Sequence, residues 1–167
     1  MGVIQVIIFD LDGTLVDSVA DIAFAANAVL AGRGLRTLAT DAFIPLIGEG
    51  ARRLMERALI AGGGDAAEEP EDALAAFLAG YAANLTRETV AYPGAAAVIE
   101  TLAAAGYRQA VCTNKPYAHA QTILARLGLD RHLTVIVGGD SVPGVRKPDP
   151  RMLAPILTAC EAPPRRR

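Results

Sequence analysis

The feature that most constrains this chain is a short apolar run that ends in two aspartates. No polar side chain interrupts the run from Val6 to Phe9, and Asp10 and Asp12 follow it directly. Such a run is typical of a strand that is buried on both faces of a parallel sheet. Because side chains alternate along a strand, the two carboxylates are expected to point the same way. Open α/β sheets bind their ligands at this end of their strands.

The same stretch has a second interpretation as a β-hairpin, because Asp12 and Gly13 form a strong two-residue turn signal. The segment from Thr14 to Val16 is short for a paired arm. It is followed by Ser18 and Asp21, which have the spacing of a helix capping box with Asp in place of Glu. The strand interpretation is therefore preferred, and the hairpin stays open as the alternative.

Further along, the chain changes from consecutive helices to alternating strands and helices. Residues 17–86 show helical periodicity without a strand pattern, and strands are expected to end at Cys112 and Val137 between later helices. Alternation at this spacing indicates right-handed βαβ units and a parallel sheet. We therefore expect an α/β core domain of residues 1–16 and 87–167, with a helical cap domain of residues 17–86 inserted in it.

Two prolines fall within expected helices. Pro45 is expected to disturb the short helix that begins at Thr40, and Pro155 is expected to kink the last helix.

Composition excludes several classes of partner. A net charge of −2 without a basic stripe, 5% aromatic residues and no Trp argue against nucleic-acid binding. No apolar stretch approaches the length of a membrane span, so no membrane contact is expected. Cys112 and Cys160 do not form a disulfide framework, which favours a reduced, cytoplasmic compartment.

Polar residues follow the expected strands where those strands end. Asp10 and Asp12 follow the first strand, Thr113 and Asn114 follow the second, and Lys147 lies in the loop after the third. The carboxyl ends of parallel strands share one edge of a sheet, so these groups can converge. Carboxylates suit a divalent cation, and a hydroxyl, an amide and a lysine suit phosphate oxygens. Together they predict metal-assisted phosphoryl transfer with a carboxylate nucleophile.

These motifs are similar to those of a known superfamily. Asp10–Ser18 resembles the first motif of the haloacid dehalogenase superfamily of phosphatases, Ala110–Lys115 its second and Lys147–Pro150 its third. Gly48–Leu59 and Gly138–Pro143 are similar to phosphoglycolate phosphatases within it. The resemblance covers essentially the whole chain and implies a Rossmann-like, three-layer core with an inserted helical cap.

The resemblance also implies roles for the matching positions. Asp10 would attack phosphorus, form an aspartyl phosphate and bind Mg²⁺. Asp12 would act as general acid and then general base, with its backbone carbonyl on the metal. Thr113 and Asn114 would hold phosphoryl oxygens, and Lys147 would neutralise the nucleophile and the phosphate.

Arg52 and Arg53 follow a Gly-rich loop at the start of an expected helix, where positive charge opposes the helix dipole. This placement suggests that Arg53 faces an anionic group of the substrate, such as a carboxylate; a solvated helix face is the simpler alternative. The resemblance then implies hydrolysis of a small phosphorylated metabolite, 2-phosphoglycolate, to glycolate and phosphate. The alternatives are another phosphate ester or pyrophosphate as substrate, or a non-catalytic remnant that keeps phosphate affinity.

The superfamily's fourth, acidic motif has no counterpart here. Asp140 imitates it but precedes Lys147, and the sequence ends at Arg167, near where the strand leading to that motif is expected. We therefore do not assign Asp140 to metal. The sheet is expected to be incomplete at the C-terminus, with an exposed edge on the first strand that allows pairing with another chain, including a homodimer. Mg²⁺ is expected to bind weakly, and this chain to be inactive or poorly active.

Overall fold

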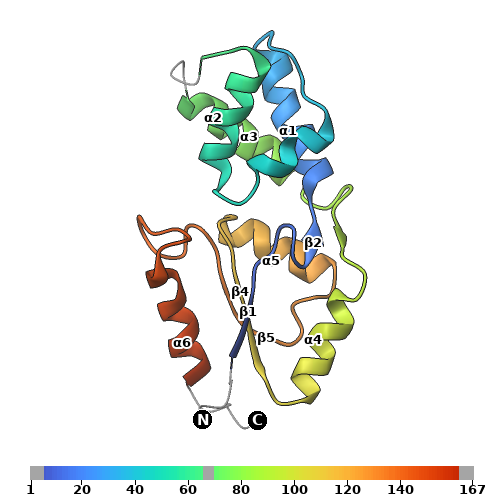
Figure 1. Ribbon diagram of the computed structural model, residues 1–167, viewed down its shortest axis with the longest axis vertical. Coiled ribbons are helices and arrows are strands. Elements are labelled where there is room, and N and C mark those ends of the chain that lie inside the picture. The colour runs from blue at the N-terminus through green and yellow to red at the C-terminus, as the bar shows by residue number, and fades with distance from the viewer. Residues whose placement is uncertain (1–5, 66–69, 162–167) are drawn as a thin grey trace. The chain divides into compact units, whose positions relative to one another are not determined.

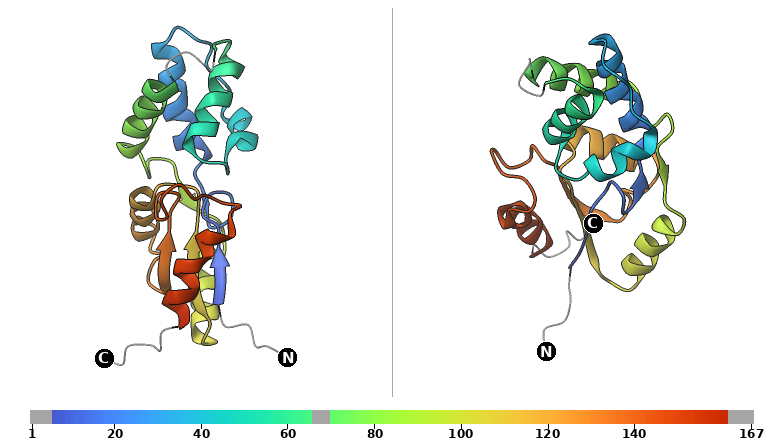
Figure 2. Two further views of the ribbon diagram at one scale, coloured as in Figure 1. Left: turned by 90° about the vertical axis from the view of Figure 1, so that its left-hand side faces the viewer. Right: turned by 45° about the horizontal axis from the view of Figure 1, so that its top comes forward.

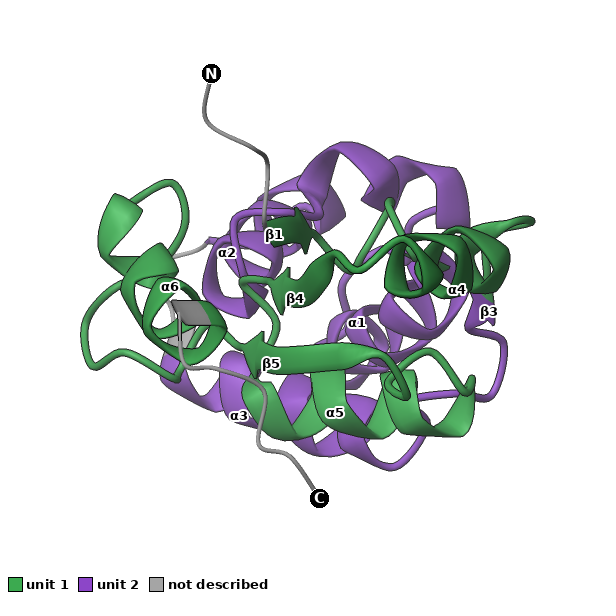
Figure 3. Ribbon diagram, turned by 90° about the horizontal axis from the view of Figure 1, so that it is seen from below, with its two compact units in different colours: residues 1–16, 91–167 green, residues 17–90 purple. Residues whose placement is uncertain are grey.

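The computed structural model describes residues 6–65 and 70–161. The chain divides into two compact units, one formed by residues 1–16 and 91–167 and the other by residues 17–90 (Figure 3). The sequence places the corresponding boundaries at residues 16 and 86. No helix in the described ranges is long and apolar enough to span a membrane.

The first unit is built on a three-stranded parallel sheet in the order β1–β4–β5 (Figure 1). These strands are β1 (Val6–Phe9), β4 (Arg108–Cys112) and β5 (Leu133–Val137). In the parallel ladders, Phe9 pairs with Val111 and Cys112 pairs with Val137. The expected α/β fold with a parallel sheet is confirmed. The hairpin alternative is wrong, because β1 pairs in parallel with a strand about a hundred residues away rather than with the segment after Gly13.

Helices cover both faces of this sheet, as Figure 3 shows. The helix α6 (Ala154–Glu161) lies on one face, and α4 (Ala95–Ala104) and α5 (Tyr117–Arg126) lie on the other. The core between α6 and the sheet consists of small and medium apolar side chains, all buried: Ala110, Cys112, Val137, Val145, Met152, Ile156 and Cys160. Burial on both faces explains why the strands lack polar alternation.

The strands of this sheet all run in one direction, so the loops that follow them lie at one end of the unit (Figure 2). Among the described strands, β1 pairs only with β4 and is an edge strand. Ile8, in the middle of β1, is 36% exposed.

The last helix is not kinked at Pro155, contrary to the sequence-based expectation. A 3₁₀ helix, η2 (Pro150–Leu153), precedes α6, and Pro155 is the second residue of α6. Backbone N–H groups in the first turn of a helix have no intrahelical acceptor, so a proline there removes no hydrogen bond.

The second unit contains three α-helices, α1 (Val19–Gly32), α2 (Ala51–Gly62) and α3 (Pro70–Ala82). A 3₁₀ helix, η1 (Thr40–Leu46), packs with α1 and α2 and contains Pro45. Short strands β2 (Val16–Asp17) and β3 (Val90–Ala91) pair where the chain enters and leaves this unit.

The predicted capping box at the start of α1 is also wrong. The side chain of Ser18 makes no capping hydrogen bond, and the exposed Asp17 instead accepts one from the backbone N–H of Val19 at 3.2 Å. Asp21 is fully buried, and its carboxylate accepts hydrogen bonds from the backbone N–H groups of Glu88 and Thr89. A distant segment with unsatisfied donors therefore competes successfully for the carboxylate.

Candidate active site

The first of the two aspartates after β1 lies beside a lysine from the loop that follows β5. The Nζ atom of Lys147 is 2.8 Å from Oδ1 of Asp10, which also accepts a hydrogen bond from the backbone N–H of Leu11 at 2.7 Å. Both charged side chains are partly open to solvent, at 27% exposed for Lys147 and 39% for Asp10. The parallel sheet thus brings together two sequence-predicted residues that are far apart in the chain.

The second aspartate pairs with a different lysine. The Nζ atom of Lys115 is 3.2 Å from Oδ1 of Asp12, and these side chains are 4% and 13% exposed, respectively. Sequence reasoning gave Lys115 no role. The sequence feature that could have indicated a role for Lys115 is its position directly after Thr113 and Asn114, at the end of a strand.

Thr113 and Asn114 lie at the end of β4, where the sequence places them. Thr113 is buried, and its hydroxyl oxygen accepts a hydrogen bond from the backbone N–H of Lys115 at 3.1 Å. The amide of Asn114 binds the backbone of Lys147 twice, with Oδ1 accepting from the N–H at 2.9 Å and Nδ2 donating to the carbonyl at 3.3 Å. Asn114 therefore fixes the backbone that carries the lysine beside Asp10.

Two glycines after β5 allow this close approach of loops. An added Cβ atom at Gly139 would overlap the carbonyl oxygen of Asn114, and one at Gly138 would lie 2.9 Å from the carbonyl oxygen of Lys115. The backbone N–H of Gly139 donates to that same carbonyl of Lys115 at 2.8 Å. Any larger residue would push the loop carrying Asn114 and Lys115 away from the end of β5.

Asp140 has a structural role. Its Oδ1 accepts a hydrogen bond from the backbone N–H of Tyr117, at the first residue of α5, at 2.7 Å. An acidic side chain at this position satisfies a free N–H and complements the helix dipole. This hydrogen bond explains why an aspartate follows Gly139 after β5, and no metal ligand role is needed for Asp140.

The neighbouring cysteine does not have the character of a nucleophile. Cys112 is buried beside Thr113, and burial raises the pKa of its thiol. The thiolate is the reactive form, so a buried thiol of this kind serves packing.

The carboxylates after β1 are a donor set of the kind that holds a divalent cation. Asp10 and Asp12 offer carboxylate oxygens, the ligand type that Mg²⁺ takes, and one or two carboxylates with waters suffice for this ion. Within residues 6–65 and 70–161, no group of three or more His, Cys, Asp or Glu residues is placed to hold a metal. The residues therefore fit an ion that keeps much of its water shell.

The arginines of the Gly-rich loop region lie in the second unit, on α2. Arg52 forms two hydrogen bonds with Glu71 of α3, at 2.7 and 2.9 Å, and this pairing lowers the pKa of the exposed Glu71 carboxyl. Arg53 is 64% exposed and pairs with Glu56 one turn later at 3.0 Å. Of the two, Arg52 is held by a neighbouring helix, and Arg53 is the more accessible cation.

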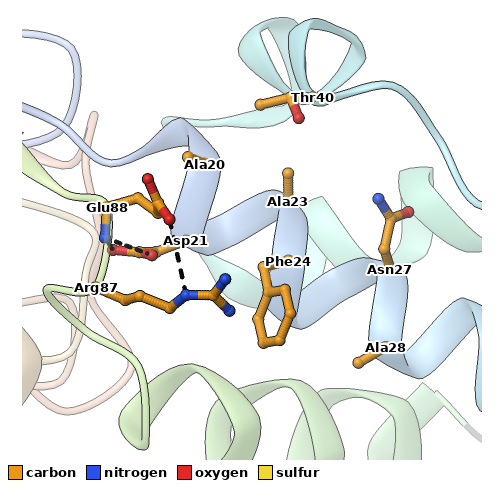
Figure 4. A pocket seen from close by; sticks show the side chains of 9 residues that line it. All are labelled: Ala20, Asp21, Ala23, Phe24, Asn27, Ala28, Thr40, Arg87 and Glu88. Atoms are coloured by element: carbon orange, nitrogen blue, oxygen red, sulfur yellow. Dashed lines mark hydrogen bonds and ion pairs between the residues drawn. The ribbon is translucent and has the colours of Figure 1, made fainter.

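The second unit also has an open pocket of about 500 Å³ beside α1 (Figure 4). Phe24 and the guanidinium of Arg87 lie on its wall, with the guanidinium carbon 4.6 Å from the ring centroid. The amide of Asn27, also on the wall, is bound on both sides to the backbone of Leu38. Asp21 faces the backbone of Glu88, as Figure 4 shows. The polar side chains of Asn27 and Asp21 are therefore already hydrogen-bonded to backbone groups of the protein.

The family of this chain follows from its similarity to known proteins. Residues 4–166 match the family model of haloacid dehalogenase-like hydrolases. The chain belongs to the haloacid dehalogenase-like hydrolase family. This confirms the resemblance that the three sequence motifs indicate.

Relatives in this family carry a more specific name. The chain is 42% identical over 158 residues to a phosphoglycolate phosphatase of Rhodospirillum rubrum, covering 92% of this chain and 65% of that protein. It therefore spans a little less than two thirds of the length of this relative.

Solved structures of the family have the same fold. A structure described as a predicted phosphoglycolate phosphatase from Haemophilus somnus 129PT matches with a TM-score of 0.79 and 33% identity, covering 94% of this chain and 70% of that one. CbbY from Rhodobacter sphaeroides, solved in complex with phosphate, matches with a TM-score of 0.75 and 26% identity, covering 97% and 75%.

Proposed function

We propose that this chain carries the phosphoryl-transfer site of a phosphomonoester hydrolase that acts on 2-phosphoglycolate. The observation that carries the proposal is the pair formed by Asp10 and Lys147 at the carboxyl end of β1, with Asp12 two residues on. A dianionic phosphate is repelled by a carboxylate nucleophile, and the adjacent ammonium offsets this repulsion. The choice of 2-phosphoglycolate as the substrate is inferred from the names of the relatives.

In the proposed reaction, a carboxylate oxygen of Asp10 bonds to phosphorus as the bond from phosphorus to the ester oxygen breaks. Asp12 gives its proton to the departing oxygen, which leaves as an alcohol. Asp12 then takes a proton from water, whose oxygen bonds to phosphorus and releases Asp10 as a free carboxylate. Thr113 and Lys147 hold phosphoryl oxygens throughout. A Mg²⁺ ion bound by Asp10 and Asp12 would supply further charge neutralisation.

The experiment is hydrolysis of 2-phosphoglycolate by the purified protein with Mg²⁺, compared with Asp10→Asn. Because the fourth acidic motif is absent, we expect slow phosphate release from the wild type and none above background from the variant; rapid turnover would contradict the expectation of poor activity. A panel with a sugar phosphate and pyrophosphate tests the alternative substrates. Arg53→Ala should raise KM for carboxylated esters alone, with Arg52→Ala as the matched variant whose arginine is held by Glu71. No phosphate release from any ester would contradict the proposal.

A second candidate function is phosphate binding without turnover. It is favoured by the small donor set, two carboxylates without a third acidic ligand in the described ranges. Trapping with beryllium fluoride, which mimics an aspartyl phosphate, separates the two. No trapping by the wild type would support phosphate binding alone, whereas trapping that is lost in Asp10→Asn would support the hydrolase. The cytoplasmic location remains a prediction from cysteine usage.

A further inference from the structure

The chain has sixteen basic residues, of which fourteen are arginine and two are lysine. Each of the two lysines pairs with one of the two aspartates that follow β1. Lys147 pairs with Asp10, and Lys115 pairs with Asp12. Lysine is a compact point charge, whereas arginine is larger, planar and forked. Both positions that face a candidate catalytic carboxylate thus hold the smaller cation.

The two pairs differ in their access to solvent. Lys147 is 27% exposed, as expected of a group that can reach a phosphate. Lys115 is 4% exposed, and its partner Asp12 is 13% exposed. A charge this enclosed needs a partner within reach, because removing either member leaves an uncompensated charge in the protein. The enclosed pair is suited to holding a side chain in place rather than to binding a substrate.

The backbone of Lys115 is anchored on both sides of its side chain. Its N–H donates to the hydroxyl oxygen of Thr113, and its carbonyl accepts from the N–H of Gly139. The close approach of Gly138 and Gly139 keeps the loop against the end of β5. The loops after two neighbouring strands therefore fix the backbone from which the Lys115 side chain extends to Asp12.

We propose that Lys115 is a positioning residue for Asp12. The ammonium holds the Asp12 carboxyl group in the orientation from which it gives a proton to the leaving oxygen and takes one from water. Lys115 keeps its own protons and does not contact the substrate. The catalytic part of this inference rests on the proposed function, whereas the pairing of Lys115 with Asp12 is independent of it.

The pairing is tested without turnover. Because the chain has two lysines, protein labelled with ¹³C-lysine gives two Hε–Cε signals in an NMR spectrum, which Lys115→Met and Lys147→Met assign. Asp12→Asn should shift the Lys115 signal and leave the Lys147 signal in place, and Asp10→Asn should do the reverse. A Lys115 signal that does not respond to Asp12→Asn, or responds equally to both changes, would overturn the proposal.

The role in positioning is tested by kcat/KM with two esters. Protonation by Asp12 matters for 2-phosphoglycolate, which has a poor leaving group, and little for p-nitrophenyl phosphate, which has a good one. Lys115→Met should lower kcat/KM for the first ester about tenfold or more and change it less than about threefold for the second. Lys115→Gln, which keeps a hydrogen-bond donor, should lose less activity on the first ester; it also replaces Lys115→Met should that variant fail to fold.

An equal loss on both esters, or a rise in KM alone, would show that Lys115 acts on the fold or on the phosphate and would overturn the positioning role. A wild-type protein that hydrolyses neither ester would refute the proposed function instead. The NMR comparison still decides in that case whether Lys115 holds Asp12.

Discussion

The carboxylate of Asp21, at the start of α1, binds Thr89, which lies 68 residues later in the chain. Its Oδ2 accepts hydrogen bonds from the backbone N–H of Thr89 at 2.8 Å and from the Thr89 hydroxyl at 2.7 Å. Both residues are buried. The bond joins the segment that enters the second unit to the segment that leaves it.

This bond makes Asp21 a stability determinant. The Asp21 carboxylate accepts from three donors, the N–H of Glu88 and the N–H and hydroxyl of Thr89. Asp21→Asn puts an NH₂ group, which is itself a donor, in front of them. We expect a loss of about 3 kcal/mol in the free energy of unfolding, measured by urea denaturation. Thr89→Val, which removes one donor, should cost about 1 kcal/mol. The exposed Asp72→Asn is the control, and an equal effect there would contradict the prediction.

The glycine after β5 is expected to resist substitution. A Cβ atom at Gly139 would overlap the backbone oxygen of Asn114, so Gly139→Ala must displace the loop that carries Asn114 and Lys115. We expect a destabilisation of about 1–3 kcal/mol and a loss of beryllium fluoride trapping. Gly80→Ala in α3, where nothing lies within 4 Å of the added atom, should instead be neutral or stabilising by up to about 1 kcal/mol.

Stability is expected to depend on pH through His119. Burial, and secondarily the charge of Lys115, lowers the pKa of His119 below the ordinary value of 6.5. Just below pH 6.5 the unfolded state therefore binds more protons than the folded state, so stability falls as the pH decreases through this window.

Urea midpoints measured from about pH 8 to about pH 5 would show this slope. His119→Gln should flatten it, and His132→Gln, at an exposed position, should not. A slope that is unchanged in His119→Gln would contradict the assignment.

Divalent ions are expected to be required for turnover. Removing them with EDTA should abolish phosphate release from 2-phosphoglycolate, and Mg²⁺ should restore it. With two carboxylates as donors, restoration should need more Mg²⁺ than a site with three acidic ligands would need. Full activity in EDTA would contradict the role assigned to the ion.

Much of the fold could be predicted from the sequence because its signals are local. The apolar run before Asp10 and the strand patterns ending at Cys112 and Val137 report burial on both faces of a sheet. Helical periodicity from residue 17 onward separates the inserted helices from the sheet. The candidate residues Asp10, Asp12 and Lys147 follow from where the strands end.

Local patterns failed where a distant partner competes. Asp21 has capping-box spacing, but its carboxylate accepts hydrogen bonds from the backbone N–H groups of residues 88 and 89 instead. Pro155 has the appearance of a helix breaker, but a preceding 3₁₀ turn places it where a proline is tolerated.

The sequence by itself thus determined the strand order in the chain, the family motifs and the residues with phosphoryl-transfer chemistry. The resemblance also gave Lys147 its role beside the nucleophile Asp10, and the structure places these two side chains together near solvent. Only the tertiary structure showed that Lys115 pairs with Asp12 in an enclosed position. The physical reason is that pairing depends on parallel strands meeting at one edge, and burial depends on how closely the loops after β4 and β5 approach.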